Sequence, residues 1–234
     1  MASYSAAQLV AAPLWGRLSD RGGRRPVLLA TLIGMAAGSV ALAFTESLFA
    51  LFAVRIATGF MAGNISAAFA YVADITAPET RARGMGIVGA AFGLGFIAGP
   101  AIGGLLAGPD PAAADFRTPA LAAAALSALA FALTWFRLPE SLPLETRTLQ
   151  PGAARTAKRP WFEMLRRPRL NGMIGLMFLA TFVFAGMEST FAIWSRRQFG
   201  WGPEQNGYLF AFIGILSAAI QGGMIGRLAA RFGE

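Results

Sequence analysis

The sequence predicts an all-α membrane protein with about seven membrane-spanning helices, and three observations support this fold class. Hydrophobic residues make up 56% of the 234 residues and charged residues only 14%, whereas a soluble domain usually carries about 25% charge. The apolar residues fall into runs close to the roughly 20 residues that cross hydrocarbon. Basic residues gather in the stretches between those runs, as in loops that fix membrane orientation.

Each apolar run is predicted to be a helix, because a helix satisfies its backbone hydrogen bonds internally within lipid. The first run is short. The runs are residues 2–16, 27–44, 48–73, 84–107, 118–136, 171–194 and 207–226. The loops after the first, third, fifth and seventh runs carry most of the 20 Lys and Arg residues, so that side is predicted to be cytoplasmic.

The composition argues against several kinds of protein. The chain has no cysteine and no histidine, so it lacks a disulfide framework, thiolate metal ligands and the commonest general base. We therefore expect neither an enzyme nor a cofactor. The net charge of +8 is explained by membrane topology rather than by nucleic-acid binding, because the basic residues lie in short clusters between apolar runs.

The first connection reads Gly16-Arg-Leu-Ser-Asp20-Arg21-Gly-Gly23-Arg24-Arg25-Pro26. Each charge would cost a few kcal/mol or more in hydrocarbon, so the stretch is predicted to be a tight loop in water. Gly16 and Gly23 let the backbone turn sharply, and Asp20 can accept hydrogen bonds at a helix N-terminus. The alternative is that the arginines only anchor topology, which is what we expect of Arg17 and Arg25.

This order of residue types resembles the loop between the second and third helices of major facilitator superfamily transporters. The resemblance implies a plan of two six-helix halves, in which residues 1–137 form helices two to six, residues 138–169 a cytoplasmic linker, and residues 170–234 helices seven and eight. It also implies that Asp20 and Arg21 belong to a latch between conformations. Arg24 would pair with Asp74 at the end of the fourth helix.

An internal repeat agrees with this plan. Gly226-Arg-Leu-Ala-Ala-Arg231-Phe-Gly233 repeats the residue types from Gly16 to Gly23, with Ala230 opposite Asp20. Parallel repeats of six helices are one of the known plans of transporters. Because the sequence begins in what looks like a membrane helix and stops within the second copy, we expect a truncated form of the twelve-helix plan. The proline-rich linker contains one possible short helix, Trp161–Leu165.

Two charged residues are candidates for the transport pathway. Arg55 lies roughly 10 Å into its span at 1.5 Å per residue, where a charge needs water or a partner. Arg55-x3-Gly59-x3-Gly63 resembles the fourth-helix motif whose arginine is tied to proton transfer; the alternative is a snorkelling arginine. Glu188 is the only acid deep in a span, and an isolated buried carboxylate tends to be neutral. It would exchange a proton or meet a cationic substrate, or else make a structural hydrogen bond.

Two polar residues and one glycine-rich motif complete the candidates. Asn64 and Gln221 either line the same cavity or hold helices together. Glycines four residues apart permit close helix packing, and a proline removes one hydrogen bond and bends a helix. The glycine-rich motif comprises Gly95, Gly99, Pro100, Gly103 and Gly104. It resembles the fifth-helix motif of drug:proton antiporters; the alternative is a generic packing kink.

Taken over nearly the whole chain, the resemblance is to the twelve-helix drug:proton antiporters, including tetracycline and multidrug exporters. It implies a monomer in a bacterial cytoplasmic membrane that exports small organic solutes in exchange for protons by alternating access. Tetracycline exporters have an aspartate in helix three where this sequence has Gly38, which favours a broader multidrug or metabolite exporter. The alternatives are a facilitator without proton coupling and a truncated, non-transporting fragment.

Overall fold

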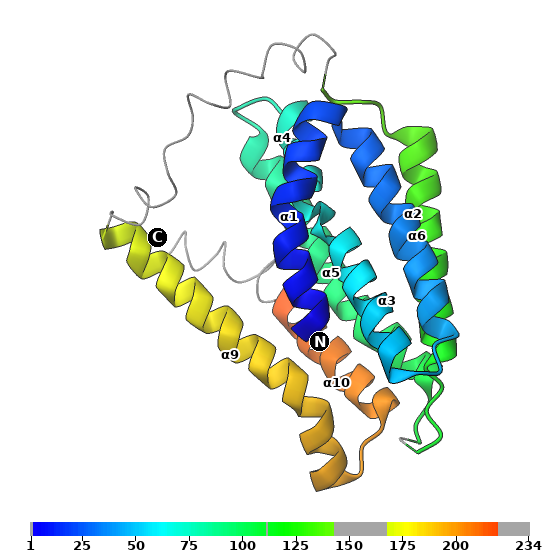
Figure 1. The fold of residues 1–234 in the computed structure, drawn as a ribbon. Coiled ribbons are helices and arrows are strands. Elements are labelled where there is room, and N and C mark those ends of the chain that lie inside the picture. Colours follow the sequence, from blue (N-terminus) through cyan, green and yellow to red (C-terminus); the bar gives the residue numbers. More distant parts are fainter. Residues whose placement is uncertain (1, 111, 143–167, 220–234) are drawn as a thin grey trace.

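The computed structural model describes residues 2–110, 112–142 and 168–219, and all regular secondary structure in that part of the chain is helical (Figure 1). The α3–η1–α4 segments follow one another without a loop, so the described residues form seven rods. The helices are α1 (Ala2–Gly22), α2 (Arg24–Ala43), α3 (Leu48–Met61), η1 (Ala62–Asn64), α4 (Ile65–Ile75), α5 (Arg81–Ala107), α6 (Arg117–Arg137), α9 (Pro168–Phe199) and α10 (Pro203–Ala219).

Each predicted run corresponds to one rod, and the prediction of an all-α multi-pass protein is confirmed. Five rods in the described part of the chain are long and apolar enough to cross a membrane. They are Arg24–Ala43, Leu48–Ile75, Arg81–Ala107, Arg117–Arg137 and Asn171–Phe199. The other two are α1, whose last turns carry charged residues, and α10, of which 17 residues are described.

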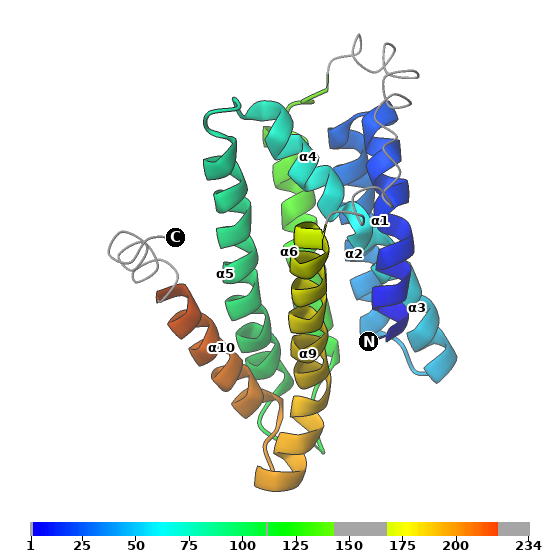
Figure 2. The ribbon, with the colours of Figure 1, turned by 90° about the vertical axis from the view of Figure 1, so that its left-hand side faces the viewer.

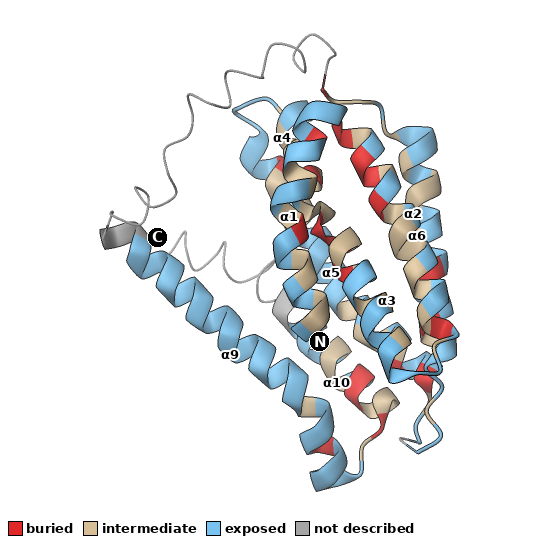
Figure 3. Ribbon diagram, in the orientation of Figure 1, coloured by how far each residue is buried: buried red, intermediate tan, exposed pale blue. Residues whose placement is uncertain are grey.

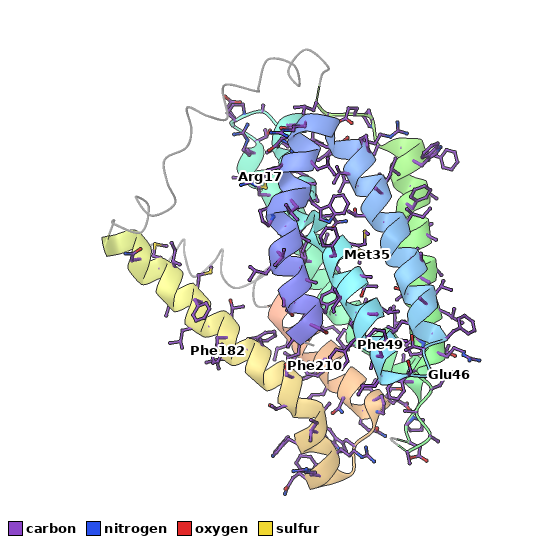
Figure 4. All side chains as sticks on the ribbon, in the orientation of Figure 1. Arg17, Met35, Glu46, Phe49, Phe182 and Phe210 are labelled. Atoms are coloured by element: carbon purple, nitrogen blue, oxygen red, sulfur yellow. The ribbon has the colours of Figure 1, made fainter. Side chains whose placement is uncertain are left out.

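The rods run alternately up and down, so the connections divide between two ends of the bundle (Figure 1). The α1–α2 and α4–α5 connections and the C-terminus of α6 lie at one end, which we call the basic end. The α2–α3, α5–α6 and α9–α10 connections lie at the other. Figure 4 shows Arg17 near the basic end and Glu46 and Phe49 at the opposite end. The positions of the rod ends therefore agree with the predicted sidedness.

The predicted loop from Gly16 to Pro26 is wrong in its extent. Helix α1 continues to Gly22 and α2 begins at Arg24, so Gly23 alone breaks the helix. Its φ of 104° lies in a region that residues with a Cβ rarely adopt. The Gly23 amide donates to the Ser19 carbonyl oxygen at 3.1 Å. The charged residues of this stretch therefore lie on two helix ends rather than in a loop.

Close contact between α1 and the α3–η1 segment depends on two glycines. A Cβ built on Gly59 would lie 2.9 Å from the Tyr4 Cα, and one on Gly63 would lie 2.8 Å from the Ala12 backbone nitrogen. Any side chain larger than the hydrogen atom of glycine would force the two helices apart. Glycines four residues apart thus form the packing face of this segment.

The short 3₁₀ segment η1 interrupts the rod where it meets α1. Two backbone carbonyls at this point accept hydrogen bonds from α1 side chains. Trp15 Nε1 donates to the Phe60 oxygen at 2.7 Å, and Gln8 Nε2 donates to the Ala62 oxygen at 3.3 Å. A 3₁₀ stretch inside a helix often marks a hinge or local strain, and these donors satisfy carbonyls that lie in the irregular region.

The described core is small and lies among α1, α2 and α4. It is formed by Val27, Leu28 and Ala67, with Trp15 and Leu138 packed against it. Most large apolar side chains are instead exposed, notably along α9 (Figure 3). Such an outward-facing apolar surface is the arrangement expected of helices surrounded by lipid.

Helices α9 and α10 are connected at the end opposite the basic end (Figure 2). Helix α10 packs extensively along α5, whereas α9 has few contacts with any helix. The α6 helix ends at Arg137, next to the predicted linker. The predicted helix Trp161–Leu165, Gln221 and the repeat from Gly226 to Gly233 lie outside the described residues. The division into two halves and a linker stays a prediction.

Candidate functional site

One guanidinium group joins three helices at the basic end. Arg24, at the start of α2, is only 8% exposed. Its Nη1 lies 2.5 Å from the Asp20 carboxylate and 2.7 Å from the Ser19 hydroxyl, both on α1. Its Nε donates to Asp74 of α4 at 3.1 Å. A planar guanidinium can hold two carboxylates at once because its donors form a fixed fork.

The N-terminus of α2 is capped by a residue far along the chain. Glu140 lies three residues beyond the end of α6, and its two oxygens accept from the backbone amides of Arg24 at 2.9 Å and Arg25 at 3.3 Å. Gly23, the N-cap residue, has no side chain for this purpose. The carboxylate satisfies two orphan donors and lies at the positive end of the helix dipole.

Further contacts attach the chain after α6 to α4. The Ser141 hydroxyl donates to Asp74 Oδ2 at 3.2 Å, and the Tyr71 hydroxyl donates to the Pro139 oxygen at 3.1 Å. We call Ser19, Asp20, Arg24, Asp74 and Glu140 the arginine cluster. It connects α1, α2, α4 and the first residues after α6.

Sequence reasoning missed Glu140 and gave Arg25 too small a role. Arg25 was expected to be a plain anchor, yet its Nη2 donates to the Trp135 oxygen at 2.6 Å and its guanidinium lies 5.7 Å from the Trp135 ring centroid. It therefore holds α2 against α6. Glu140 could have been found from the sequence, since it is an acid directly after the fifth apolar run and hence at the same end as Arg24 and Asp74.

Gly16 and Arg21, the other two predicted latch residues of α1, lie outside the arginine cluster. Gly16 faces α4, where an added Cβ would lie 3.5 Å from the Ser66 hydroxyl oxygen. Arg21 is exposed in the last turn of α1 and makes no hydrogen bond or ion pair with the described residues. A cation at a helix C-terminus interacts favourably with the helix dipole. A latch role for Arg21 stays a prediction.

Arg55 is half-buried on the face of α3 that meets α1. Gly59, one turn further along, touches the α1 backbone at Tyr4. The Tyr4 phenol and the Arg55 guanidinium interact electrostatically. Tyr4 is therefore a polar neighbour of Arg55 within the chain.

Asn64 connects two helices. Its side-chain amide donates to the Thr31 hydroxyl of α2 at 2.8 Å, and Thr31 is fully buried. This is the helix-joining alternative for Asn64. No hydrogen bond joins Asn64 to Arg55 or Glu188 within the described part of the chain. Gln221, expected in the same cavity, lies outside the described residues.

Glu188 is exposed on α9, contrary to the expected burial. The reason is that α9 has few neighbours among the described residues. Its position on the helix is nevertheless informative. Phe184 lies one turn before Glu188 and contacts Phe96 of α5, with ring centroids 5.6 Å apart. Phe191 lies three residues after it and contacts Phe210 of α10 at 5.4 Å. Residues at these spacings share one helix face, so Glu188 lies on the side of α9 that meets α5 and α10.

The glycine-rich motif of α5 has two faces. On one face, a Cβ on Gly104 would lie 2.5 Å from the Pro203 oxygen and 3.0 Å from the Gly207 Cα. Conversely, a Cβ on Gly207 would lie 2.6 Å from the Pro100 oxygen. Helices α5 and α10 therefore touch backbone to backbone at this point. We call this contact the α5–α10 seam.

The opposite face of α5 is open. An added Cβ on Gly95, Gly99 or Gly103 would meet no described atom within 4 Å. These residues are spaced by four, and at 3.6 residues per turn Gly103, Gly99 and Gly95 lie about 100°, about 140° and about 180° around the helix from Gly104. The motif thus divides into a packed face that includes Pro100 and Gly104 and an open glycine face.

This arrangement of helices agrees with comparisons to known proteins. A profile of the Major Facilitator Superfamily matches residues 1–234, and the chain belongs to that family. It is 36% identical over 235 residues to the tetracycline resistance protein, class C, of Escherichia coli, covering 100% of this chain and 58% of that protein.

Two crystal structures extend the comparison. The human organic anion transporter MFSD10 (TETRAN) matches 94% of this chain and 54% of its own, with 33% identity and a TM-score of 0.68. A D-xylose-proton symporter matches 94% of this chain and 55% of its own at 19% identity, with a TM-score of 0.67; it shows the fold alone. The chain spans about half the length of these relatives. It is a transporter-family protein, not a member of an enzyme family.

Proposed function

We propose that the chain belongs to a proton-coupled exporter of small organic solutes that works by alternating access. The observation that carries this proposal is the α5–α10 seam. It joins α5 to α10, which the predicted plan assigns to different halves, through backbone contacts among Pro100, Gly104, Pro203 and Gly207. Two helices joined by a smooth backbone contact can tilt against each other with little repacking.

The arginine cluster supplies a second element of this mechanism. Because Arg24 holds carboxylates from α1 and α4, the basic ends of three helices would move as one body. Asp20 also remains 53% exposed at its side chain, so it can accept hydrogen bonds from another segment. This supports a role for Asp20 as a latch that favours one conformation.

Glu188 is the proposed proton acceptor, with Arg55 as a positive charge that tunes the pathway. Glu188 lies on the side of α9 that meets α5 and α10, between two aromatic contacts. If packing removes it from water in one conformation, its protonation would change the free energy of the surrounding cavity, so that proton and solute would compete for that cavity. That competition would couple proton entry to solute exit.

Support for the class of solute comes from two relatives and from the surroundings of Gly38. One relative is named for tetracycline resistance and another for organic anion transport, so solutes of different charge occur among similar proteins. Gly38 packs against Thr58, and a Cβ there would collide with the Thr58 methyl group. The aspartate expected of a tetracycline exporter would require at least the Thr58 side chain to turn away. We therefore favour a multidrug or metabolite solute over tetracycline.

The proposal is tested by solute export from proteoliposomes with and without a protonophore, using the wild type, Glu188→Gln and the neighbouring control Ser189→Ala. We expect export to stop when the proton gradient is collapsed and in Glu188→Gln, and to persist in the control. Export that survives the protonophore would support a facilitator instead. An absence of export in every sample would support a non-transporting fragment and contradict the proposal.

A further inference from the structure

A cavity opens at the end of the molecule opposite the arginine cluster. It has a volume of about 710 Å³ and lies between the α5–α6 connection, the last turns of α9 and the start of α10. This volume falls in the range of about 300–1,000 Å³ typical of sites for small molecules. The residues that matter for its chemistry are Phe116, Arg196, Arg197, Trp201, Pro203 and Asn206.

The cavity wall carries two positive charges. Arg196 and Arg197 are consecutive in the last turns of α9, and neither side chain makes a hydrogen bond or ion pair with the described residues. None of the residues that line the cavity is acidic. Guanidinium groups without carboxylate partners present hydrogen-bond donors to an anion in the cavity.

The nearby acids are engaged elsewhere. The Asp115 carboxylate accepts from the Thr118 hydroxyl and from the backbone amides of Arg117 and Thr118, and these hydrogen bonds hold the pKa of Asp115 below its usual value. Glu204 accepts from the Tyr208 hydroxyl at 3.0 Å. Neither acid lines the cavity, so Arg196 and Arg197 are the charged residues of its wall.

The two helices at this cavity are joined by buried polar contacts. The Ser195 hydroxyl lies 2.9 Å from Asn206 Oδ1, and both residues are buried. The Gly202 amide donates to Gln205 Oε1 at 2.9 Å. Satisfied buried hydrogen bonds of this kind fix the relative position of the elements they connect. The arginines and the aromatic side of the cavity are therefore held on a defined frame.

We propose that this cavity is a binding site for amphipathic organic anions. Arg196 and Arg197 would bind a carboxylate or sulfonate, and the rings of Phe116 and Trp201 would cover an aromatic or apolar body. The inference deepens the proposed function and rests on it, because it names a solute class that would be held at the mouth of the pathway. The site would act before or after passage through the helices, separately from Glu188.

The test is calorimetric titration of the chain in phosphatidylcholine nanodiscs with 2-naphthoate, and with 2-naphthamide as the neutral counterpart. We expect Arg196→Gln/Arg197→Gln to weaken naphthoate binding by about tenfold or more, since charge-assisted hydrogen bonds are lost. The control Arg17→Gln removes an exposed arginine at the basic end and should leave binding unchanged. Equal binding by the double variant, or naphthamide binding as tightly as naphthoate, would overturn the proposal.

Two further measurements keep the result decisive. If the double variant does not fold, added salt should weaken naphthoate but not naphthamide binding to the wild type; no salt effect would overturn the proposal. Repeating the titration with phosphatidylglycerol in the nanodiscs separates a solute from an anionic lipid headgroup. Unchanged affinity for naphthoate in the presence of phosphatidylglycerol supports a solute as the ligand. Loss of naphthoate binding would indicate that the lipid headgroup occupies the site and would overturn the assignment to a solute. Equilibrium binding needs no proton gradient, so its failure is distinguishable from a failure of export.

Discussion

Arg24 shows how one side chain organises the basic end of the molecule. Its guanidinium contacts carboxylates on α1 and α4, while its backbone amide donates to Glu140 from beyond α6. The residue is almost fully buried, and a buried charge is strongly destabilising unless it has partners such as these. A lysine at this position could not reproduce the geometry, because one ammonium nitrogen cannot replace the forked donors.

Substituting Glu140 tests the long-range cap of α2. We expect Glu140→Ala to lower the free energy of unfolding by about 0.5–2 kcal/mol, the usual effect of losing an N-cap acceptor. Thermal unfolding followed by tryptophan fluorescence would measure the loss. The matched control is Glu79→Ala at the same end, because Glu79 is exposed and has no hydrogen bond in the described structure. Equal effects of the two substitutions would contradict the assigned cap.

The contacts of single residues could be predicted from the sequence where a family motif names both partners. The pairing of Arg24 with Asp74 follows from a motif and is present in the structure. Its role as a latch remains a prediction. The contact of Arg25 with Trp135 was not predictable, because it depends on how α2 leans on α6. The exposure of Glu188 differs from the expectation because burial depends on neighbours that the local sequence does not specify.

At the scale of helices, α5 is the element with two distinct surfaces. Gly104 belongs to the α5–α10 seam, whereas Gly99 lies on the open glycine face. Both residues belong to the same glycine-rich sequence motif. The two glycines lie about 140° apart around the helix, so substitution should have different consequences at the two positions.

Leucine at each of these glycines provides a matched comparison. At Gly104 an added Cβ would lie 2.5 Å from a backbone oxygen of α10, which cannot move aside as a side chain would. We expect Gly104→Leu to lower the free energy of unfolding by about 1–3 kcal/mol, as in overpacked cores. Gly99→Leu should cause no such loss. Thermal unfolding checks both, and a destabilised Gly99→Leu with an unaffected Gly104→Leu would contradict the seam.

The helices themselves were largely predictable, because every apolar run became a rod. The ends of the rods were not. The first connection was predicted as a loop of charged residues, but the positive φ of Gly23 lets α1 and α2 meet with a one-residue break. The interruption at η1 was also missed. It reflects the close approach of Gly63 to α1, a tertiary contact without a local sequence signal.

At the scale of the molecule, α9 and α10 contact the other described helices mainly through the α5–α10 seam. The arginine cluster fastens the basic ends of α1, α2 and α4, and the proposed anion site lies at the opposite end of the molecule. The structure therefore contains the arginine cluster at one end, the α5–α10 seam between α5 and α10, and the cavity with Arg196 and Arg197 at the other end. Family membership follows from the whole chain, whereas the proposed export and proton coupling would depend on movement of α10 against α5.

The measurement that tests this account most directly is solute export after a disulfide is formed across the seam. The chain has no cysteine, and a Cβ on Gly214 would lie 3.1 Å from the Ile97 Cβ, close to the spacing of about 3.5–4.5 Å found in disulfides. Oxidised Ile97→Cys/Gly214→Cys should stop exporting solute and recover on reduction, while the control Gly99→Cys/Gly214→Cys should neither cross-link nor lose export. Export that continues at full rate through the cross-linked protein would contradict the account.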